Sequence, residues 1–277
     1  MARVRKWGQI SLTYAILTLF LLVVFMPILG VILSAFKTNT EVIQGPFALP
    51  KEWIFDNFVN AWNAGRFSAY FRSSVIVVIP VVVVSVFLSI LTGYAFGTLL
   101  FPGQRLLFYT ILIGFMVPFE AVVIPLYHML RSVDLTNSYW ALILPQIGLS
   151  FSFGTFWMSS FFGSAPQELI DAATIDGCSR WQTLWKVLWP LARPAVLTLV
   201  VLIFMWTWNE FLLALVLVQD DNLRTLPVGL AFFQGRFTAD IPRLAAGSLI
   251  VAGPIVVVYA FFQRHFIRGM LSGSVKG

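Results

Sequence analysis

Six long apolar segments alternate with short polar segments along the chain. Each apolar segment has few charges and at least the roughly 20 residues that a helix needs to cross a bilayer core of about 30 Å. The six segments are Ile10–Phe36, Ser73–Phe101, Leu106–Leu130, Tyr139–Phe162, Ala195–Gln219 and Leu244–Gln263. The pattern predicts an all-α integral membrane protein with six transmembrane helices.

Prolines interrupt most of these segments. They are Pro27, Pro80, Pro118, Pro125, Pro145 and Pro254. Neighbouring helices and local backbone adjustments satisfy the carbonyls that a proline frees inside a membrane helix. We therefore expect kinked helices that continue through these residues.

The composition supports a membrane protein and excludes several other classes. Hydrophobic residues make up 59% of the 277 residues and charged residues only 11%, which exceeds what a soluble core needs. The net charge of +6 is scattered between the spans, so we expect no nucleic-acid surface. One cysteine and two distant histidines predict neither a disulfide nor a metal site. A Gly-rich phosphate loop is absent, so we expect this chain to bind no cofactor.

The basic residues near the chain ends indicate the orientation. Arg3, Arg5 and Lys6 precede the first span as in a secretory signal, but the apolar run is too long, which favours a signal-anchor. The side that holds both termini carries 10 Lys and Arg residues, against 8 on the other side. Clusters close to span ends favour cytoplasmic termini.

The segment Ser164–Pro194 is polar and lies between the fourth and fifth spans. Ser164 and Gln167 resemble a capping box, which predicts a helix from about Ala165 that ends at Gly177. Ser179 and Gln182 repeat the start signal, and Pro190 is expected to end the second helix. The segment therefore predicts two short helices that meet at a glycine elbow.

Two interpretations of this elbow remain open on the residues alone. The second helix presents one apolar face, which suits a pair of helices lying at the lipid headgroups. That face consists of Trp181, Leu184, Trp185 and Leu188. Alternatively, the small Ala172 and Ala173 let another protein approach closely, and Asp171 and Asp176 offer partners for its basic residues.

The elbow resembles the cytoplasmic loop of the membrane subunits of binding-protein-dependent ABC importers. That loop has an E-A-A motif, then D-G, and about nine residues later I-x-L-P. The corresponding residues here are Asp171-Ala172-Ala173, Ile175-Asp176-Gly177 and Val187-Leu188-Trp189-Pro190. Asp171 replaces Glu and Trp189 replaces Leu. The shorter Asp171 side chain implies a weaker or shifted salt bridge to the ATPase.

Further motifs resemble the carbohydrate-uptake branch of the family, specifically the maltose-permease G-type subunits. These motifs are Phe101-Pro102-Gly103, Val117-Pro118-Phe119, Ile124-Pro125-Leu126, Trp208-Asn209-Glu210-Phe211, Leu226-Pro227-Val228-Gly229-Leu230, Gln263-Arg264-His265-Phe266-Ile267-Arg268-Gly269 and Ser274-Val275-Lys276-Gly277. The resemblance covers essentially the whole chain and implies a type I ABC importer permease fold.

The resemblance also implies an organisation and a set of partners. Residues 1–72 would form the first span and an external loop, 73–268 a five-helix permease core, and 269–277 a cytoplasmic tail. The chain would work in the cytoplasmic membrane of a bacterium or archaeon with an F-type sister subunit, two ATPase subunits that bind ATP and Mg, an external solute-binding protein and a sugar.

The resemblance assigns roles to three groups of residues. The ATPase-coupling group is Asp171, Ala172, Ala173, Ile175, Asp176 and Gly177. The tail residues Val275, Lys276 and Gly277 would contact the ATPase subunits, unless the tail is merely solvated. The external residues Gln234, Gly235, Arg236 and Phe237 would contact the binding protein.

Two carboxyl groups within the predicted spans require an explanation, because burying a charge in a membrane is costly. Glu120 lies midway along the third span, and Glu210 lies midway along the fifth beside Trp206 and Asn209. These residues either line the translocation pathway or form a polar clamp between helices. In a rival hypothesis, Glu120 and Glu210 carry protons in a self-contained secondary carrier, although no inverted repeat supports it.

Overall fold

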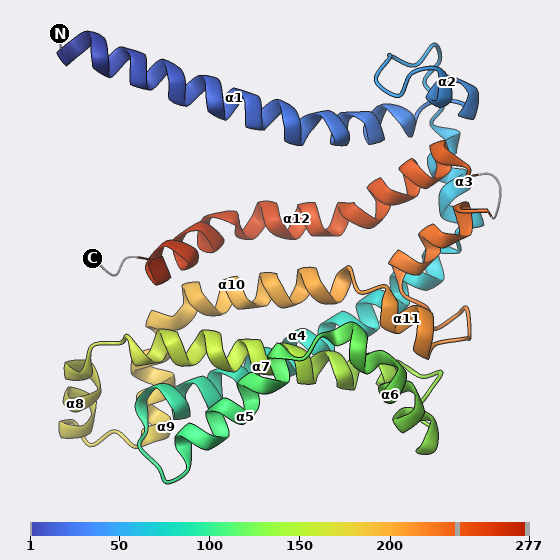
Figure 1. Cartoon of the computed structure of the whole chain (residues 1–277). Coiled ribbons are helices and arrows are strands. Elements are labelled where there is room, and N and C mark those ends of the chain that lie inside the picture. Colours follow the sequence, from blue (N-terminus) through green and yellow to red (C-terminus); the bar gives the residue numbers. More distant parts are fainter. Residues whose placement is uncertain (1, 236–238, 275–277) are drawn as a thin grey trace. The chain divides into compact units, whose positions relative to one another are not determined.

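The computed structural model of the chain is built from helices (Figure 1). It describes residues 2–235 and 239–274, with side chains described between residues 12 and 264. Within this part, five helices are long and apolar enough to cross a membrane, or six if one bent pair forms a single span. Four of the five are α1 (Ala2–Ser34), α4 (Phe67–Thr98), α7 (Tyr139–Gly163) and α12 (Ile241–Ser274). They continue through Pro27, Pro80, Pro145 and Pro254.

The third expected span is broken instead of kinked. It consists of α5 (Gln104–Met116) and α6 (Phe119–Ser132), which are bent by 96° relative to each other. Pro118 lacks an N–H and favours an extended residue before it, and Val117 has φ −69° and ψ 125°. The helix therefore ends at Met116, whereas α6 continues through Pro125.

The fifth expected span differs at both ends. Its helix begins as α9 (Arg180–Gln182), widens into the π-helix η1 (Thr183–Leu188) and continues as α10 (Trp189–Trp208). The chain then breaks before the short α11 (Leu212–Leu217). The predicted continuous helix Ala195–Gln219 was therefore wrong beyond Trp208.

The chain divides into two compact units. Unit 1 comprises Met1–Ser68 and Gly229–Gly253, and unit 2 comprises Ala69–Val228 and Pro254–Gly277. In unit 1, the short helices α2 (Asn39–Gln44) and α3 (Asp56–Ala64) follow α1. The Phe36 ring packs against the rings of Trp53, Phe55 and Phe58, with centroids 5.1 to 5.2 Å apart. These aromatic side chains of the loop therefore pack around Phe36, which follows the end of α1, within unit 1.

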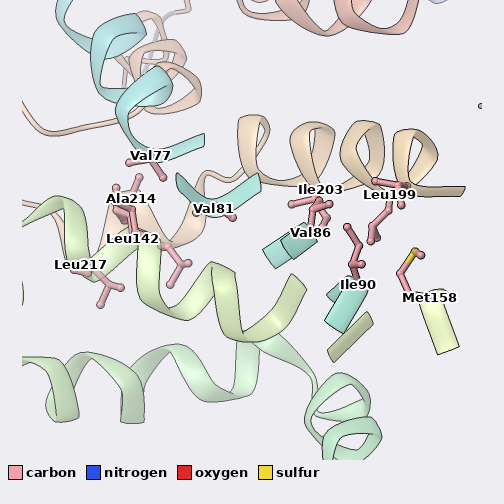
Figure 2. Packing of buried hydrophobic residues seen from close by; sticks show 14 of the residues in the cluster. Val77, Val81, Val86, Ile90, Leu142, Met158, Leu199, Ile203, Ala214 and Leu217 are labelled. Carbon is pink, nitrogen blue, oxygen red and sulfur yellow. The ribbon is translucent and has the colours of Figure 1, made fainter. Parts of the chain in front are cut away.

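Buried apolar side chains from several helices form the core of unit 2 (Figure 2). Buried residues of α4, α7, α10 and α11 meet there, including Val86, Ile90, Met158, Leu199 and Ile203. Apolar side chains thus fix the helices that carry the site described below.

Glycines bring α4 close to α7. A Cβ atom at Gly93 would overlap Met158 Cβ, and one at Gly97 would lie 2.8 Å from Ser159 O. Real Cβ atoms do not approach so closely, so only glycine fits at either position. These two glycines, spaced four residues apart, therefore allow α4 and α7 to pack closely.

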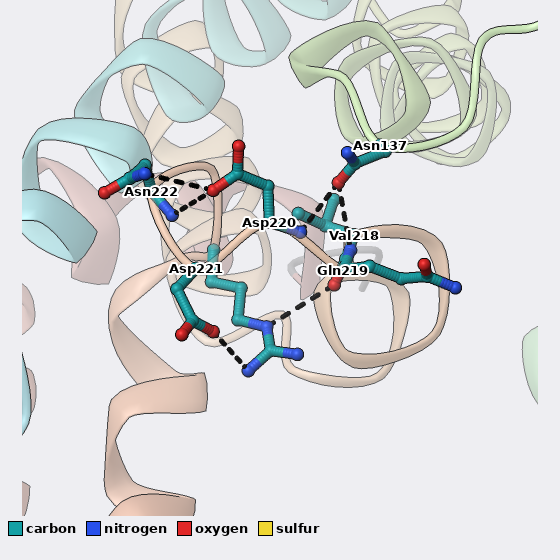
Figure 3. A network of polar contacts seen from close by, with 7 residues as sticks. Asn137, Val218, Gln219, Asp220, Asp221 and Asn222 are labelled. Atoms are coloured by element: carbon teal, nitrogen blue, oxygen red, sulfur yellow. Dashed lines mark hydrogen bonds and ion pairs between the residues drawn. The ribbon is translucent and has the colours of Figure 1, made fainter.

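A polar network holds the loop after α6 against the loop after α11 (Figure 3). Asn137 has φ 55°, and its Oδ1 accepts hydrogen bonds from the backbone N–H groups of Gln219 (3.0 Å) and Asp220 (2.8 Å). The Asn137 N–H donates to Leu217 O at 2.9 Å. Arg224 pairs with Asp221 at 2.8 Å. These contacts fix the end of α11 beside the start of α7.

Replacing Gly93 with alanine should destabilise the folded protein by about 1 to 3 kcal/mol, because the new methyl group has no room against Met158. Gly148→Ala is the matched control, since nothing lies within 4 Å of a Cβ atom there. Thermal unfolding of the purified protein in detergent measures both effects. Equal melting temperatures for the two variants would contradict the packing described.

Candidate functional site

Helix α8 (Gln167–Ile175) lies in the polar loop at one end of unit 2, whereas α6 and α11 lie at the opposite end (Figure 1). The predicted capping box at its start was wrong. Ser164 Oγ donates backward to Phe161 O at 2.8 Å, and the N-cap residue is Pro166, whose extended backbone starts the helix two residues later than expected. The Gln167 amide instead donates to Asp171 Oδ1 at 3.0 Å.

The glycine elbow is confirmed and has the geometry of a Schellman motif. Gly177 has φ +76°, the Cys178 N–H donates to Ala173 O at 2.9 Å, and the Gly177 N–H donates to Thr174 O at 3.1 Å. The following helix starts with the predicted capping box. The Ser179 N–H donates to Gln182 Oε1 at 2.9 Å, and the Gln182 N–H donates to Ser179 Oγ at 3.3 Å.

The second helix of the elbow does not end at Pro190. The Trp189 N–H donates to Leu184 O, five residues back, which widens the turn just before this proline. A proline ring in a regular α-helix clashes with the carbonyl four residues earlier, and a π turn provides one route around that clash. The chain is consequently helical from Arg180 to Trp208, over 29 residues.

The exposed face of α8 is made by residues spaced three or four apart. Its members are Glu168, Asp171, Ala172 and Ile175, all of which are exposed. Ile175 is 86% exposed, which is unusual for a large apolar side chain, whereas Ala173 is only 5% exposed. Ala173 therefore packs within unit 2, and the surface available to a partner centres on Ile175 between Asp171 and Asp176.

On the second helix, the predicted apolar face is partly buried. Leu184 and Leu188 are each 1% exposed, whereas Trp181 is 58% exposed. The helix therefore packs through its leucines and leaves its first tryptophan on the surface.

A cavity of about 430 Å³ lies where the break between α5 and α6 and the break between α10 and α11 approach α7. The polar groups that line it come from Gln146, Ser150, Thr207 and Glu210. Aromatic rings line the rest, chiefly Phe115, Phe119, Phe153 and Trp206. The Trp206 and Phe153 rings meet edge to face, with centroids 4.8 Å apart. Hydrogen-bonding groups beside aromatic faces suit a polar ligand with apolar C–H surfaces.

Glu210 lies in the break between α10 and α11. Its carboxylate accepts hydrogen bonds from the N–H of Leu213 (2.9 Å) and from the N–H of Ala214 (3.4 Å). It thereby satisfies the free N–H groups at the start of α11, where a negative charge is favourable. The predicted clamp between helices is replaced by a local helix cap that also lines the cavity.

The other two candidate residues of the spans, Asn209 and Glu120, are not among the described residues that line the cavity. Asn209 is exposed, and its amide donates to Met205 O at 2.8 Å. Glu120 is exposed in the first turn of α6. Gln146 is a lining residue that sequence reasoning missed. The sequence signal that could have indicated it is a polar amide next to Pro145 in an otherwise apolar span.

The external candidates are described only in part. Gln234 and Gly235 are exposed, and Gln234 pairs with Ala239 in an isolated β-bridge. Arg236 and Phe237 lie outside the described residues, as do Val275, Lys276 and Gly277.

Comparison with known proteins identifies the family to which this membrane-helix fold with its elbow belongs. Residues 86–272 match the family model described as "Binding-protein-dependent transport system inner membrane component". The chain belongs to this family, and it is therefore a multi-pass membrane protein with the permease role of an ABC transporter.

Two relatives and one solved structure illustrate the similarity. The diacetylchitobiose uptake system permease protein NgcG of Streptomyces coelicolor is 33% identical over 98% of this chain and 90% of its own length. The arabinooligosaccharides transport system permease protein AraQ of Halalkalibacterium halodurans is 35% identical over 91% of each. A chain of a bacterial ABC transporter that imports alginate matches with a TM-score of 0.78 and 23% identity, over 95% of this chain and 97% of that one. The last match supports the fold.

Replacing Glu210 with alanine should destabilise the protein by about 1 kcal/mol, because α11 loses its cap. Glu210→Gln should have a smaller effect, since the amide oxygen still accepts a hydrogen bond. Asn209→Ala serves as the control on the adjacent exposed residue. Melting temperatures of the purified variants check this order. A Gln variant as unstable as the Ala variant would show that charge, not capping, stabilises this position.

Proposed function

We propose that this chain forms one of the two membrane subunits of an ATP-driven sugar importer. Family membership and relatives that serve sugar uptake systems support the proposal. The observation that carries it is the helix Arg180–Trp208, which joins an exposed elbow to a cavity lined by polar and aromatic groups. Such a helix provides a mechanical path between an ATPase and the transported sugar.

Partners are proposed for both sides of the membrane. The α8 end and both termini face the cytoplasm, where two ATPase subunits bind ATP and Mg. An F-type sister subunit supplies the other half of the pathway. An external solute-binding protein delivers the sugar, and Gln234–Phe237 contact it. The tail residues Val275, Lys276 and Gly277 contact the ATPase subunits.

The exposed face of α8 suits a cleft in an ATPase subunit. Ile175 offers a compact apolar contact, and Asp171 and Asp176 offer carboxylates to basic residues of the partner. When the two ATPase subunits close on ATP, they move α8, and the helix that follows the elbow transmits this movement to Trp206 and the cavity.

The cavity would provide weak contacts for a sugar in transit. Gln146, Ser150 and Thr207 supply groups that exchange hydrogen bonds with hydroxyls, and Trp206 presents an indole ring to the C–H faces of a sugar. About 430 Å³ lies within the range of small-molecule sites, roughly 300 to 1,000 Å³.

A proton-coupled carrier is the alternative, and the geometry gives it less support. Such a carrier needs a carboxyl group that binds and releases a proton during transport. The Glu210 carboxylate instead caps α11, and Glu120 is exposed outside the cavity lining. The importer also requires ATPase and sister subunits for transport, whereas a carrier transports when it is reconstituted alone.

Cysteine crosslinking tests the coupling role of α8. In a Cys178→Ala background, Ile175→Cys should crosslink to the co-expressed ATPase subunit, because residue 175 is exposed on the proposed contact face. The yield should change when ATP is added, since ATP moves the ATPase subunits relative to α8. Immunoblotting of membranes with and without ATP measures the yield.

Ala173→Cys provides the matched control, because this residue lies on the same helix but is buried. It should give little crosslinking. No crosslink at residue 175, with an intact complex verified by co-purification, would overturn the coupling role and favour helices that lie on the membrane surface.

A further inference from the structure

A second cleft, of about 470 Å³, lies at the α8 end of unit 2, because its lining includes Gly163, the last residue of the helix before α8. It lies between the end of α4, the start of α5 and the end of α7, and it is separate from the cavity at the broken helices. The chain enters or leaves a membrane helix at Thr98, Gln104 and Gly163. The cleft therefore lies at the depth where the bilayer changes from headgroups to acyl chains.

The charged group of the lining lies at the mouth of the cleft and its aromatic rings lie deeper, while Leu100 and the small Ser159 and Ser160 also belong to the lining. Gln104 and Arg105 lie at the mouth, in the first turn of α5. Phe108 follows one turn further in, and Phe156 lies almost two turns before the end of α7. A cation at the mouth with aromatic rings further in suits an amphipathic molecule whose charged group lies at the mouth and whose apolar chain points toward the membrane centre.

Small residues form the floor of the cleft, and aromatic rings form its walls. Gly97 and Ser159 pack so closely that a Cβ atom on Gly97 would lie 2.8 Å from Ser159 O. The adjacent Ser160 is exposed and leaves open space. The Phe96 and Phe108 rings, with centroids 5.5 Å apart, form one wall. The Gln104 amide donates to Phe96 O at 2.8 Å and fixes the mouth beside the end of α4.

Arg105 is available to a ligand at this mouth. Its guanidinium is exposed and has no ion pair or hydrogen bond with any residue that the structure describes. A guanidinium can donate two parallel hydrogen bonds to two oxygens of one phosphate. Water molecules in the cleft do not offer this paired, charged contact. Basic pockets between membrane helices on the cytoplasmic side are suited to anionic lipid headgroups.

We propose that this cleft binds one anionic phospholipid, with its phosphate on Arg105 and an acyl chain between Phe96, Phe108 and Phe156. A helix of the sister subunit is the competing occupant, and the variants below distinguish the two. The site rests on the proposed orientation, in which the α8 end of unit 2 faces the cytoplasm. It does not depend on the identity of the sugar or on the coupling role of α8, so its test is independent of both.

Native mass spectrometry of the delipidated complete transporter tests this proposal. Dioleoylphosphatidylglycerol should bind with higher affinity than dioleoylphosphatidylcholine, and glycerol 3-phosphate should not compete, because the chain contributes to binding. Arg105→Ala should weaken the phosphatidylglycerol interaction about tenfold, as expected for one lost charged hydrogen-bonding group, and Arg105→Lys should weaken it less.

Two further variants separate the cleft from general surface charge. Ser160→Leu fills the floor without changing any charge, and it should prevent binding of the phospholipid. Lys186→Ala removes another exposed cation that does not line the cleft, and it should have no effect.

Three results would overturn the proposal. The first is equal binding of the two phospholipids, and the second is phosphatidylglycerol binding that survives both Arg105→Ala and Ser160→Leu. The third is loss of the sister subunit on purification of these variants while lipid binding is unchanged, which would show that a protein helix occupies the cleft.

Discussion

The helix from Arg180 to Trp208 is the constraint on which the rest of the structure depends. At about 1.5 Å per residue, its 29 residues span roughly 43 Å, enough to cross a bilayer core. It contains Pro190 and Pro194, either of which interrupts an ordinary helix. The π turn just before Pro190 keeps the helix continuous. One end thus follows the Gly177 elbow directly, and the other reaches the cavity through Trp206 and Thr207.

Two breaks complete the cavity that this helix reaches, one between α5 and α6 and one between α10 and α11. Pro118 ends α5, and the Glu210 carboxylate caps the helix that restarts after Trp208, so the free N–H groups at the second break are satisfied locally. Close glycine packing between α4 and α7 holds the opposite wall, which carries Gln146 and Ser150. A rigid wall facing two interrupted helices is an arrangement that can change shape without unpacking the core.

Local sequence patterns predicted the parts of the site that local interactions determine. Ser179 with Gln182 and the left-handed Gly177 were correct, because a cap and an αL residue depend on only a few neighbouring groups. Ser164 failed although its pattern was the same, since Pro166 already starts the helix. No pattern indicated that Ala173 is buried while Ala172 is exposed, or that an apolar span stops at Trp208, because packing against other helices decides both. The family resemblance, carried by the Asp171–Gly177 motif, indicated the function that periodicity alone left open.

The central claim is that α8 and the helix after the elbow move as one body when ATP is used. Spin labels on Ile175→Cys and Asn209→Cys, in a Cys178→Ala background, place one label beside the elbow and the other just beyond Trp208, both at exposed positions. Electron paramagnetic resonance of the complete transporter measures the distance between them. The account predicts the same distance distribution with and without ATP, in a complex whose ATP-driven transport is intact. A nucleotide-dependent shift or a second peak would contradict it and place the flexible joint within the helix itself.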